Sequence, residues 1–210
     1  MGKELLENLP SYSTSWESAK KIMGNRAIGI EAAGKIHLET KDFNIQNYNV
    51  VPFSKEELAS SDRNSILLAV PEVNLSTLTE VAKDFYWGLA PLKGDFVTTK
   101  ARPGYHIFTI PPKDISYKEM ERNSKRASQL SLPYVSEVAY FLGVWQAIFK
   151  KPPTDHWIFC SDVDEGGWKI FVHTFKDGKV EFDCDSDYGG YINPPRGVII
   201  PHYYRDYSAK

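Results

Sequence analysis

The stretch HWIFCSDVDEGGWKIFVHTFKDGKVEFDC, His156–Cys184, decides the fold of this chain. Its segments His156–Ser161, Trp168–Phe175 and Lys179–Cys184 are rich in aromatic and β-branched residues and predict three short strands. Asp177-Gly178, between the second and third segments, is typical of a hairpin turn, because glycine adopts positive φ without steric cost and aspartate tolerates it. The stretch therefore predicts a small antiparallel meander.

The first of these strands needs cover on both faces. Residues 157–160 read Trp-Ile-Phe-Cys, so apolar side chains point to either side of the sheet. Just before them, Pro133–Phe149 is an apolar run that ends in Lys150-Lys151-Pro152-Pro153, a combination typical of a helix C-terminus. We expect this run to be a buried helix packed on the meander. A membrane span is not expected, because the run is short and contains Glu137.

Capping signals and periodicity predict further elements upstream. Capping boxes, in which Ser or Thr is followed three residues later by Glu, predict helix starts at Thr14–Glu17, Ser54–Glu57 and Ser116–Glu119. The other expected elements are helices over Ile28–Leu38 and Leu75–Phe85 and strands over Ser65–Val70 and Gly104–Ile110.

This order of elements predicts an α+β fold. Helices are expected to pack on a mixed or antiparallel sheet that ends in the C-terminal three-stranded meander. We expect a single domain over residues 1–210, and a weak subdivision, if there is one, would fall near residues 41–49.

The composition argues against several classes of function. The 210 residues carry a formal net charge of −2, with 42% hydrophobic and 13% aromatic residues. A globular core is therefore expected, and the chain lacks the basic footprint of a nucleic-acid-binding protein. The two cysteines, Cys160 and Cys184, and the absence of a long apolar run at the N-terminus predict a protein of the reducing cytoplasm. Neither nucleic acid nor a membrane is expected as a partner.

Six segments of the chain occur in an order that resembles a family of uncharacterised bacterial proteins. They are Leu5–Pro10, Ser15–Gly24, Ile28–Ile36, Val51–Leu58, Asn64–Pro71 and Trp157–Phe175. The resemblance covers most of the chain loosely and is carried mainly by the order of these segments. It implies that the chain is a single unit, but it implies no activity, cofactor or catalytic residue.

Two acidic runs indicate a candidate cation site at one end of the meander. Asp162 and Asp164 lie between the first two strands, and Asp183 and Asp185 lie at the exit of the third. An antiparallel meander would bring both runs to the same end, where carboxylate oxygens suit a divalent cation. An EF-hand is excluded, because the glycine and the glutamate that it requires are missing. The alternative, which we expect, is that these acids are solvated turn residues and that the protein has no cofactor.

Four cations fall on one face of a predicted helix. Lys118, Arg122, Lys125 and Arg126 are spaced at i, i+4, i+7 and i+8. Such a face either contacts phosphate or is an ordinary solvated surface, and we expect the second. Together with the acidic runs, these cations define one hypothesis for function, a divalent-metal-dependent hydrolase that acts on phosphodiesters.

The sequence contains no recognised catalytic motif. It has no Walker A loop, dinucleotide fingerprint, nucleophile elbow or His-Glu-x-x-His motif, and its five histidines have no paired ligand spacing. The C-terminal tail carries Tyr203, Tyr204 and Tyr207, and tyrosine is enriched at interfaces. The leading hypothesis is therefore a non-catalytic module that binds a protein partner through this tail. The alternative is that these tyrosines pack back onto the protein.

Overall fold

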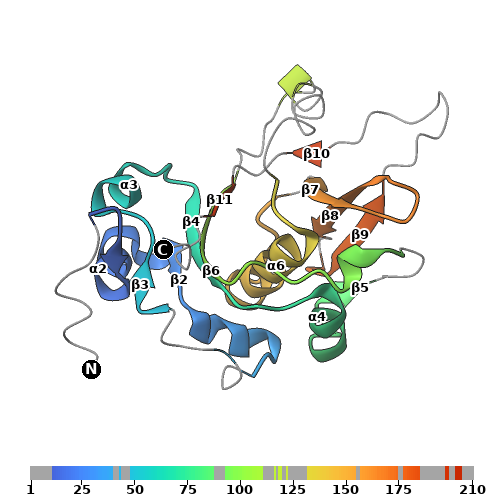
Figure 1. Ribbon diagram of the computed structural model, residues 1–210, viewed down its shortest axis with the longest axis horizontal. Helices are drawn as coiled ribbons and strands as arrows, with labels where there is room; N and C mark the ends of the chain where they lie inside the picture. The colour runs from blue at the N-terminus through green and yellow to red at the C-terminus, as the bar shows by residue number, and fades with distance from the viewer. Residues whose placement is uncertain are drawn as a thin grey trace.

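Figure 1 shows a computed structural model of the chain, in which three sheets and several helices form an α+β fold, as the sequence predicts. The structure describes residues 11–39, 43, 48–87, 93–110, 116, 118, 119, 122, 132–154, 157–174, 177–184, 197, 198 and 202–204. The place of the predicted subdivision, residues 41–49, falls mostly outside these ranges.

The predicted meander is confirmed. Strands β7 (Trp157–Val163), β8 (Lys169–Thr174) and β9 (Val180–Cys184) pair antiparallel in sequence order. The turn between β8 and β9 contains Gly178 at φ +88°, and the Asp177 carboxylate accepts the Lys179 N–H at 3.1 Å. Two short strands, β10 (Gly197–Val198) and β5 (Tyr86–Trp87), extend the meander on either side through parallel pairing. The resulting five-stranded sheet is therefore mixed.

Helix α6 (Val135–Phe149) covers one face of this sheet, as predicted. Its side chains pack with inward-facing residues of all three meander strands, namely Ile158, Cys160, Ile170, Val172 and Phe182. On the opposite face, Phe159 and Phe171 form a separate small cluster with Leu132. The first meander strand thus has apolar contacts on both sides, which explains its unbroken apolar run.

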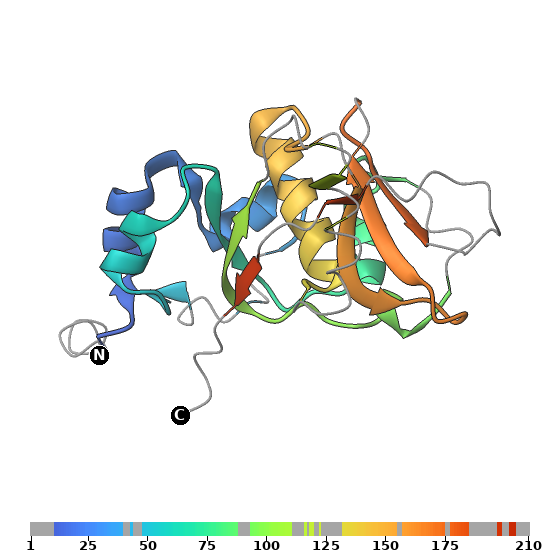
Figure 2. The ribbon, with the colours of Figure 1, turned by 90° about the horizontal axis from the view of Figure 1, so that it is seen from above.

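A second sheet packs on the other side of α6. Its strands are β2 (Ala27–Ile28), β4 (Ser65–Val70), β6 (Gly104–Thr109) and β11 (His202–Tyr204), in the order β11-β6-β4-β2. Figure 2 shows α6 lying between this sheet and the meander. The rings of Phe108 on β6 and Phe141 on α6 stack at 4.7 Å. Enclosure by two sheets explains why every residue from Val135 to Val144 is buried.

Strand β4 is buried on both faces and separates two apolar clusters. Ile66, Leu68 and Val70 face α6, whereas Leu67 and Ala69 face a second cluster. That second cluster is built from α2 (Trp16–Met23), α3 (Lys55–Ser60) and the small antiparallel sheet of β1 (Thr14–Ser15) and β3 (Val50–Val51). The remaining elements are the 3₁₀ helices η1 (Gly24–Arg26), η2 (Ile30–Ile36) and η5 (Asp95–Val97) and the helix α4 (Leu75–Val81).

The helix N-caps agree with the prediction at Ser54, whereas the N-cap of the first helix lies one residue later than predicted. Ser54 and Glu57 form the predicted capping box, with bonds of 2.7 and 3.1 Å. The first helix is capped by Ser15, whose Oγ accepts the Ser18 N–H, and not by Thr14, one residue earlier. The Glu119 N–H bonds to Ser116 Oγ at 3.3 Å as expected, although most of that helix lies outside the described residues.

The segment Ile28–Leu38 differs from its expected α-helix. Its first residue belongs to strand β2, and the 3₁₀ helix η2 occupies only Ile30–Ile36. Gly29 and Gly34 flank and interrupt this stretch, and glycine disfavours a regular α-helix. Helix α4 likewise ends at Val81, short of the predicted Phe85. Among the described helices, none combines the length and apolarity that crossing a membrane requires.

Candidate functional site

Polar groups gather at both ends of helix α6. At its N-terminus, Arg102, Glu137, Tyr134 and Tyr204 form a cluster that we call the arginine clasp. At its C-terminus, cationic and aromatic side chains line an open pocket. The two places differ in chemistry. In the clasp the cation is paired with a carboxylate, whereas no described carboxylate lines the pocket beside its cations.

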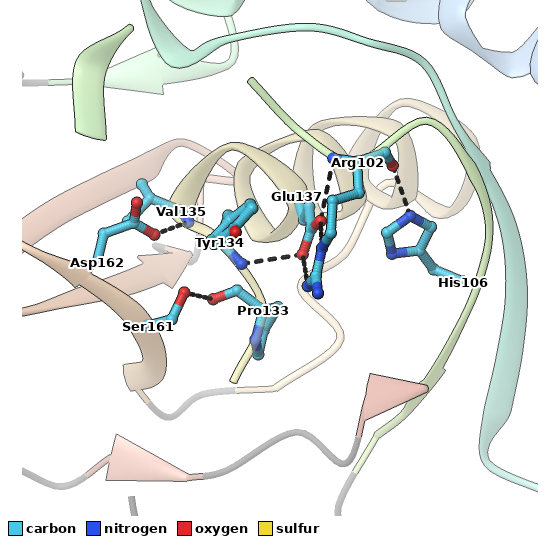
Figure 3. A network of polar contacts seen from close by, with 8 residues as sticks. All are labelled: Arg102, His106, Pro133, Tyr134, Val135, Glu137, Ser161 and Asp162. Carbon is cyan, nitrogen blue, oxygen red and sulfur yellow. Dashed lines mark hydrogen bonds and ion pairs between the residues drawn. The ribbon is translucent and has the colours of Figure 1, made fainter. Parts of the chain in front are cut away.

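The arginine clasp is centred on a bidentate ion pair. Arg102 Nε and Nη2 donate to the two carboxylate oxygens of Glu137 at 2.7 and 2.8 Å, and the Arg102 backbone N–H adds a bond of 3.1 Å. The Tyr134 N–H donates to Glu137 Oε2 at 2.9 Å (Figure 3). The Glu137 side chain is fully buried, so it depends on these four bonds in place of water.

Aromatic rings enclose the guanidinium of the clasp. Arg102 Cζ lies 4.6 Å from the ring centroid of Tyr134 and 4.8 Å from that of Tyr204, within the range of cation–π contacts. Tyr204 comes from β11, which pairs with β6 opposite His106. Tyr204 therefore packs on the body of the protein, as the alternative considered for the tail requires. The Tyr203 side chain and all of Tyr207 lie outside the described part of the structure, so the interface at these residues stays a prediction.

His106 contacts the arginine clasp through the backbone of Arg102. Its Nε2 lies 2.8 Å from the carbonyl oxygen of Arg102 (Figure 3). Its ring centroid lies 4.8 Å from that of Tyr204. Burial lowers the pKa of His106 to about 4, so the ring is neutral at pH 7. A neutral ring that faces a carbonyl oxygen carries its proton on Nε2, which makes His106 a hydrogen-bond donor here.

Asp162, the first of the predicted metal ligands, caps helix α6. Its Oδ2 accepts the backbone N–H of Val135, the first residue of the helix, at 2.7 Å (Figure 3). Beside it, Ser161 donates to the Pro133 carbonyl oxygen through both its backbone N–H and its hydroxyl. Burial raises the pKa of the Asp162 carboxyl. These contacts give Asp162 a structural role at a helix N-terminus.

The other predicted ligands that the structure describes, Asp164 and Asp183, have surroundings of their own. Asp164 Oδ1 accepts the N–H groups of Gly166 and Trp168 at 2.9 and 2.8 Å, which organises the β7–β8 turn. Asp183 is exposed. In the β8–β9 ladder it lies opposite Phe171, whose ring packs on the face of the sheet away from α6. Asp185 is not among the described residues. Within the described ranges, no three His, Cys, Asp or Glu side chains gather as a metal site would require, and the cation stays a prediction.

The predicted phosphate-facing helix is described only in part. Lys118 and Arg122 have helical backbone and exposed side chains, whereas Lys125 and Arg126 fall outside the described ranges. The described pair is consistent with either a solvated face or a phosphate-binding face. This hypothesis therefore stays a prediction too.

The pocket at the C-terminal end of α6 has a volume of about 420 Å³. We call it the α6 pocket. It lies between η1, the loop before β4, the end of β6 and the end of α6. Its lining residues are Asn25, Arg26, Arg63, Asn64, Ile66, Ile110, Trp145, Phe149, Lys151, Pro152 and Pro153. The set combines apolar residues with three cations, and no described Asp or Glu belongs to it.

The loop before β4 gives the α6 pocket a fixed edge. Arg26 Nη1 donates to the carbonyl oxygens of Asp62 and Ser65 at 2.9 and 3.4 Å. The Asp62 carboxylate accepts the Asn64 N–H at 2.7 Å, and the Ile110 N–H bonds to the Asn64 carbonyl oxygen at 3.1 Å. Arg26 is thus tied to the same loop that carries the other arginine of the pocket.

The cations of the α6 pocket are available to a ligand. Arg63 and Lys151 are exposed, and neither forms an ion pair or hydrogen bond with the described chain. Arg26 uses only Nη1 for its described bonds, which leaves Nε and Nη2. The C-terminus of α6 contributes about half a negative charge, which three full positive charges outweigh. The pocket therefore attracts anions.

Sequence reasoning missed the α6 pocket. Its residues come from four separate segments, and each segment had an ordinary interpretation, such as Lys150-Lys151-Pro152-Pro153 as a helix end. The only available signal was Arg26 and Arg63, two arginines placed just outside predicted secondary structure. Such a signal has no meaning until β2 and β4 are known to be neighbours.

Comparisons of the chain with protein-family models, with curated proteins and with solved structures found no match. The resemblance to a bacterial family therefore stays an expectation.

Proposed function

We propose that this protein acts by binding rather than by catalysis, and that its ligand is a small anionic molecule held in the α6 pocket. One observation carries the proposal. Three cationic side chains, Arg26, Arg63 and Lys151, line a pocket together with apolar residues, and no described acid lines it. Unpaired cations beside apolar surface favour a ligand that has a negative charge and an apolar part.

The chemistry of the lining residues supports binding over catalysis. They supply positive charge, amide groups and apolar contact. No described His, Asp, Glu, Cys, Ser or Tyr lines the pocket, so its described walls lack a nucleophile paired with a separate general base. Such a site can orient and hold an anion, and among its described walls the Lys151 amine is the one group of a type that also serves in proton transfer or covalent catalysis.

The expected affinity is moderate. Each charge-assisted hydrogen bond contributes about 1.5–3 kcal/mol, whereas association costs several kcal/mol in lost freedom. Arg63 and Lys151 are exposed, so part of their attraction is screened by water and salt. We expect dissociation constants of about 1–100 μM at low ionic strength, weakening as salt is added.

Calorimetric titration with small anions tests this proposal. The variant Arg63→Gln/Lys151→Gln removes two pocket cations without touching the bonds of Arg26. The matched control Lys35→Gln/Lys83→Gln removes the same net charge from exposed positions outside the pocket. We expect anion binding to weaken at least tenfold in the pocket variant and to change little in the control. Equal losses in both variants would mean that net charge alone is responsible, and the proposal would fail.

A further inference from the structure

The α6 pocket combines its cations with an aromatic wall. Trp145 and Phe149, one turn apart on α6, have ring centroids 4.3 Å apart with planes inclined at 40°. Both are half-buried, and Pro152 and Pro153 continue the apolar surface. A planar ring that enters the pocket meets aromatic and prolyl carbon on one side.

The orientation of Trp145 determines which of its atoms a ligand can reach. The Nε1 atom is buried and has no hydrogen-bond partner, although the residue as a whole is half-buried. The accessible part of the indole is therefore carbon, which favours stacking over hydrogen bonding. Stacking of a base on an aromatic side chain is worth about 1–3 kcal/mol.

The charge of the pocket favours a dianion over a monoanion. Three cations line the pocket and no described acid does, so its local charge is positive even with the Asp62 carboxylate on the adjoining loop and the C-terminus of α6 nearby. The Coulomb attraction of a ligand group in this field scales with its charge, so a phosphomonoester gains about twice as much as a carboxylate. Arginine also matches phosphate oxygens bidentately, and two of the three cations are arginines.

We infer that the ligand of the α6 pocket is a phosphomonoester of a planar ring compound, with the phosphate among Arg26, Arg63 and Lys151 and the ring against Trp145 and Phe149. This inference rests on the proposed function, because it specifies the ligand of the same pocket. The volume of about 420 Å³ lies toward the small end of ligand sites. It suits one ring system with one phosphate.

Five probes in phosphate-free buffer test the ligand class by calorimetry. Adenosine monophosphate and phenyl phosphate contain both the ring and the dianion, and they separate a nucleotide from a simple aryl phosphate. Inorganic phosphate lacks the ring, adenosine lacks the charge, and benzoate is an aromatic monoanion. We expect at least one of the first two to bind tenfold more tightly than each of the other three.

Two variants assign the parts of the ligand to the parts of the pocket. Phe149→Leu removes one ring of the aromatic wall, and Trp145→Leu removes the other. Either is expected to weaken ring phosphates about tenfold while the affinity for inorganic phosphate stays within twofold. The melting temperature of each variant is measured alongside, and Phe149→Leu alone suffices if Trp145→Leu does not fold.

The outcomes separate this inference from the proposed function. If benzoate or inorganic phosphate binds as tightly as the ring phosphates, and Arg63→Gln/Lys151→Gln still abolishes binding, the ligand class is wrong and the anion site stands. If the ring phosphates bind best but both aromatic variants leave their affinity unchanged, the ring does not lie on this wall and the inference is overturned. If no anion binds, or the pocket variant has no effect, the proposed function fails together with the inference.

Discussion

Arg102 and Glu137 form a two-bond ion pair in which the carboxylate is fully buried and the guanidinium side chain is 27% exposed. The pair joins the segment before β6 to the first turn of α6, and Tyr204 of β11 covers it. Three parts of the chain that are distant in sequence therefore meet at one charged contact. Its loss should affect the stability of the fold more than any exposed ion pair does.

Replacing Arg102 by alanine tests this contact. The variant leaves the Glu137 carboxylate buried without its cation, and breaking a buried pair in this way costs about 3–5 kcal/mol. The exposed pair Lys100–Glu72, at 2.8 Å, provides a control, because exposed pairs contribute about 0–1 kcal/mol. Urea unfolding of Arg102→Ala and Lys100→Ala measures both. A loss of less than 1 kcal/mol in Arg102→Ala would contradict a structural role for the clasp.

His106 gives the stability of the protein a defined pH dependence. Its pKa in the folded protein is about 4, below the ordinary value of 6.5, because burial disfavours the charged ring. Between these values the unfolded chain binds more protons than the folded one, so stability falls as the pH decreases from 6.5 to 4. The slope from one such group reaches about 1.4 kcal/mol per pH unit.

The variant His106→Gln isolates this contribution from that of the other histidines and of Asp162. Its amide can still donate to the Arg102 carbonyl oxygen but does not titrate. We expect the free energy of unfolding of the variant to depend less steeply on pH than that of the parent between pH 4 and 6.5. Parallel pH profiles for the two proteins would show that His106 is not buried in its neutral form.

Gly143 lies at a close contact between α6 and Tyr86. A Cβ added at position 143 would overlap the Tyr86 hydroxyl oxygen, which donates to the Ala139 carbonyl oxygen at 3.0 Å. Gly143→Ala should therefore destabilise the protein by about 1–3 kcal/mol, although alanine favours a helix by about 1 kcal/mol over glycine. Thermal unfolding measures the change.

The double variant Gly143→Ala/Tyr86→Phe provides the internal control for this contact. Removing the hydroxyl makes room for the added methyl group, so Gly143→Ala should be less costly in the Tyr86→Phe background. Gly34→Ala is the second control, because its Cβ would meet nothing within 4 Å. An equal cost of Gly143→Ala in both backgrounds would place the strain elsewhere.

The acids of the meander are expected to differ in their effect on stability. Asp162→Ala removes a helix cap and should cost about 0.5–2 kcal/mol, whereas Asp183→Ala at an exposed position should stay within about 0.5 kcal/mol.

In a shared metal site, both variants would instead abolish a stabilising effect of the cation. We expect no thermal shift with millimolar Ca²⁺, Mg²⁺ or Mn²⁺, and a shift lost in both variants would establish the metal site.

Part of this structure could be predicted from local sequence. The meander follows from three β-rich segments separated by turn residues such as Asp177-Gly178. Each of these signals extends over only a few residues, so it can be recognised without knowledge of the tertiary structure. The packing of α6 on the meander follows from the two apolar faces of β7. The strands β4 and β6 were predicted too, but not that they form a second sheet, although the nearly continuous apolar character of α6 is what enclosure on two sides requires.

The rest depends on contacts between distant segments. Strands such as β2, β5 and β10 contain only two residues each, which is too short for any periodic pattern. The same holds for the α6 pocket, because Arg26 and Arg63 become neighbours only through the pairing of β2 with β4. The acidic runs also gave no local sign that Asp162 caps a helix that precedes it in the chain.

A titration followed by two-dimensional NMR tests the central claim most directly, because it locates an anion on the chain without a prior assumption about the site. The ¹H–¹⁵N spectrum is recorded while phenyl phosphate is added at low salt. The account predicts that the largest shift changes fall on the backbone amides of Arg26, Asn64 and Ile110, on the end of α6 and on the indole N–H of Trp145. Shift changes concentrated on Lys118 and Arg122, or no saturable change at any residue, would contradict it.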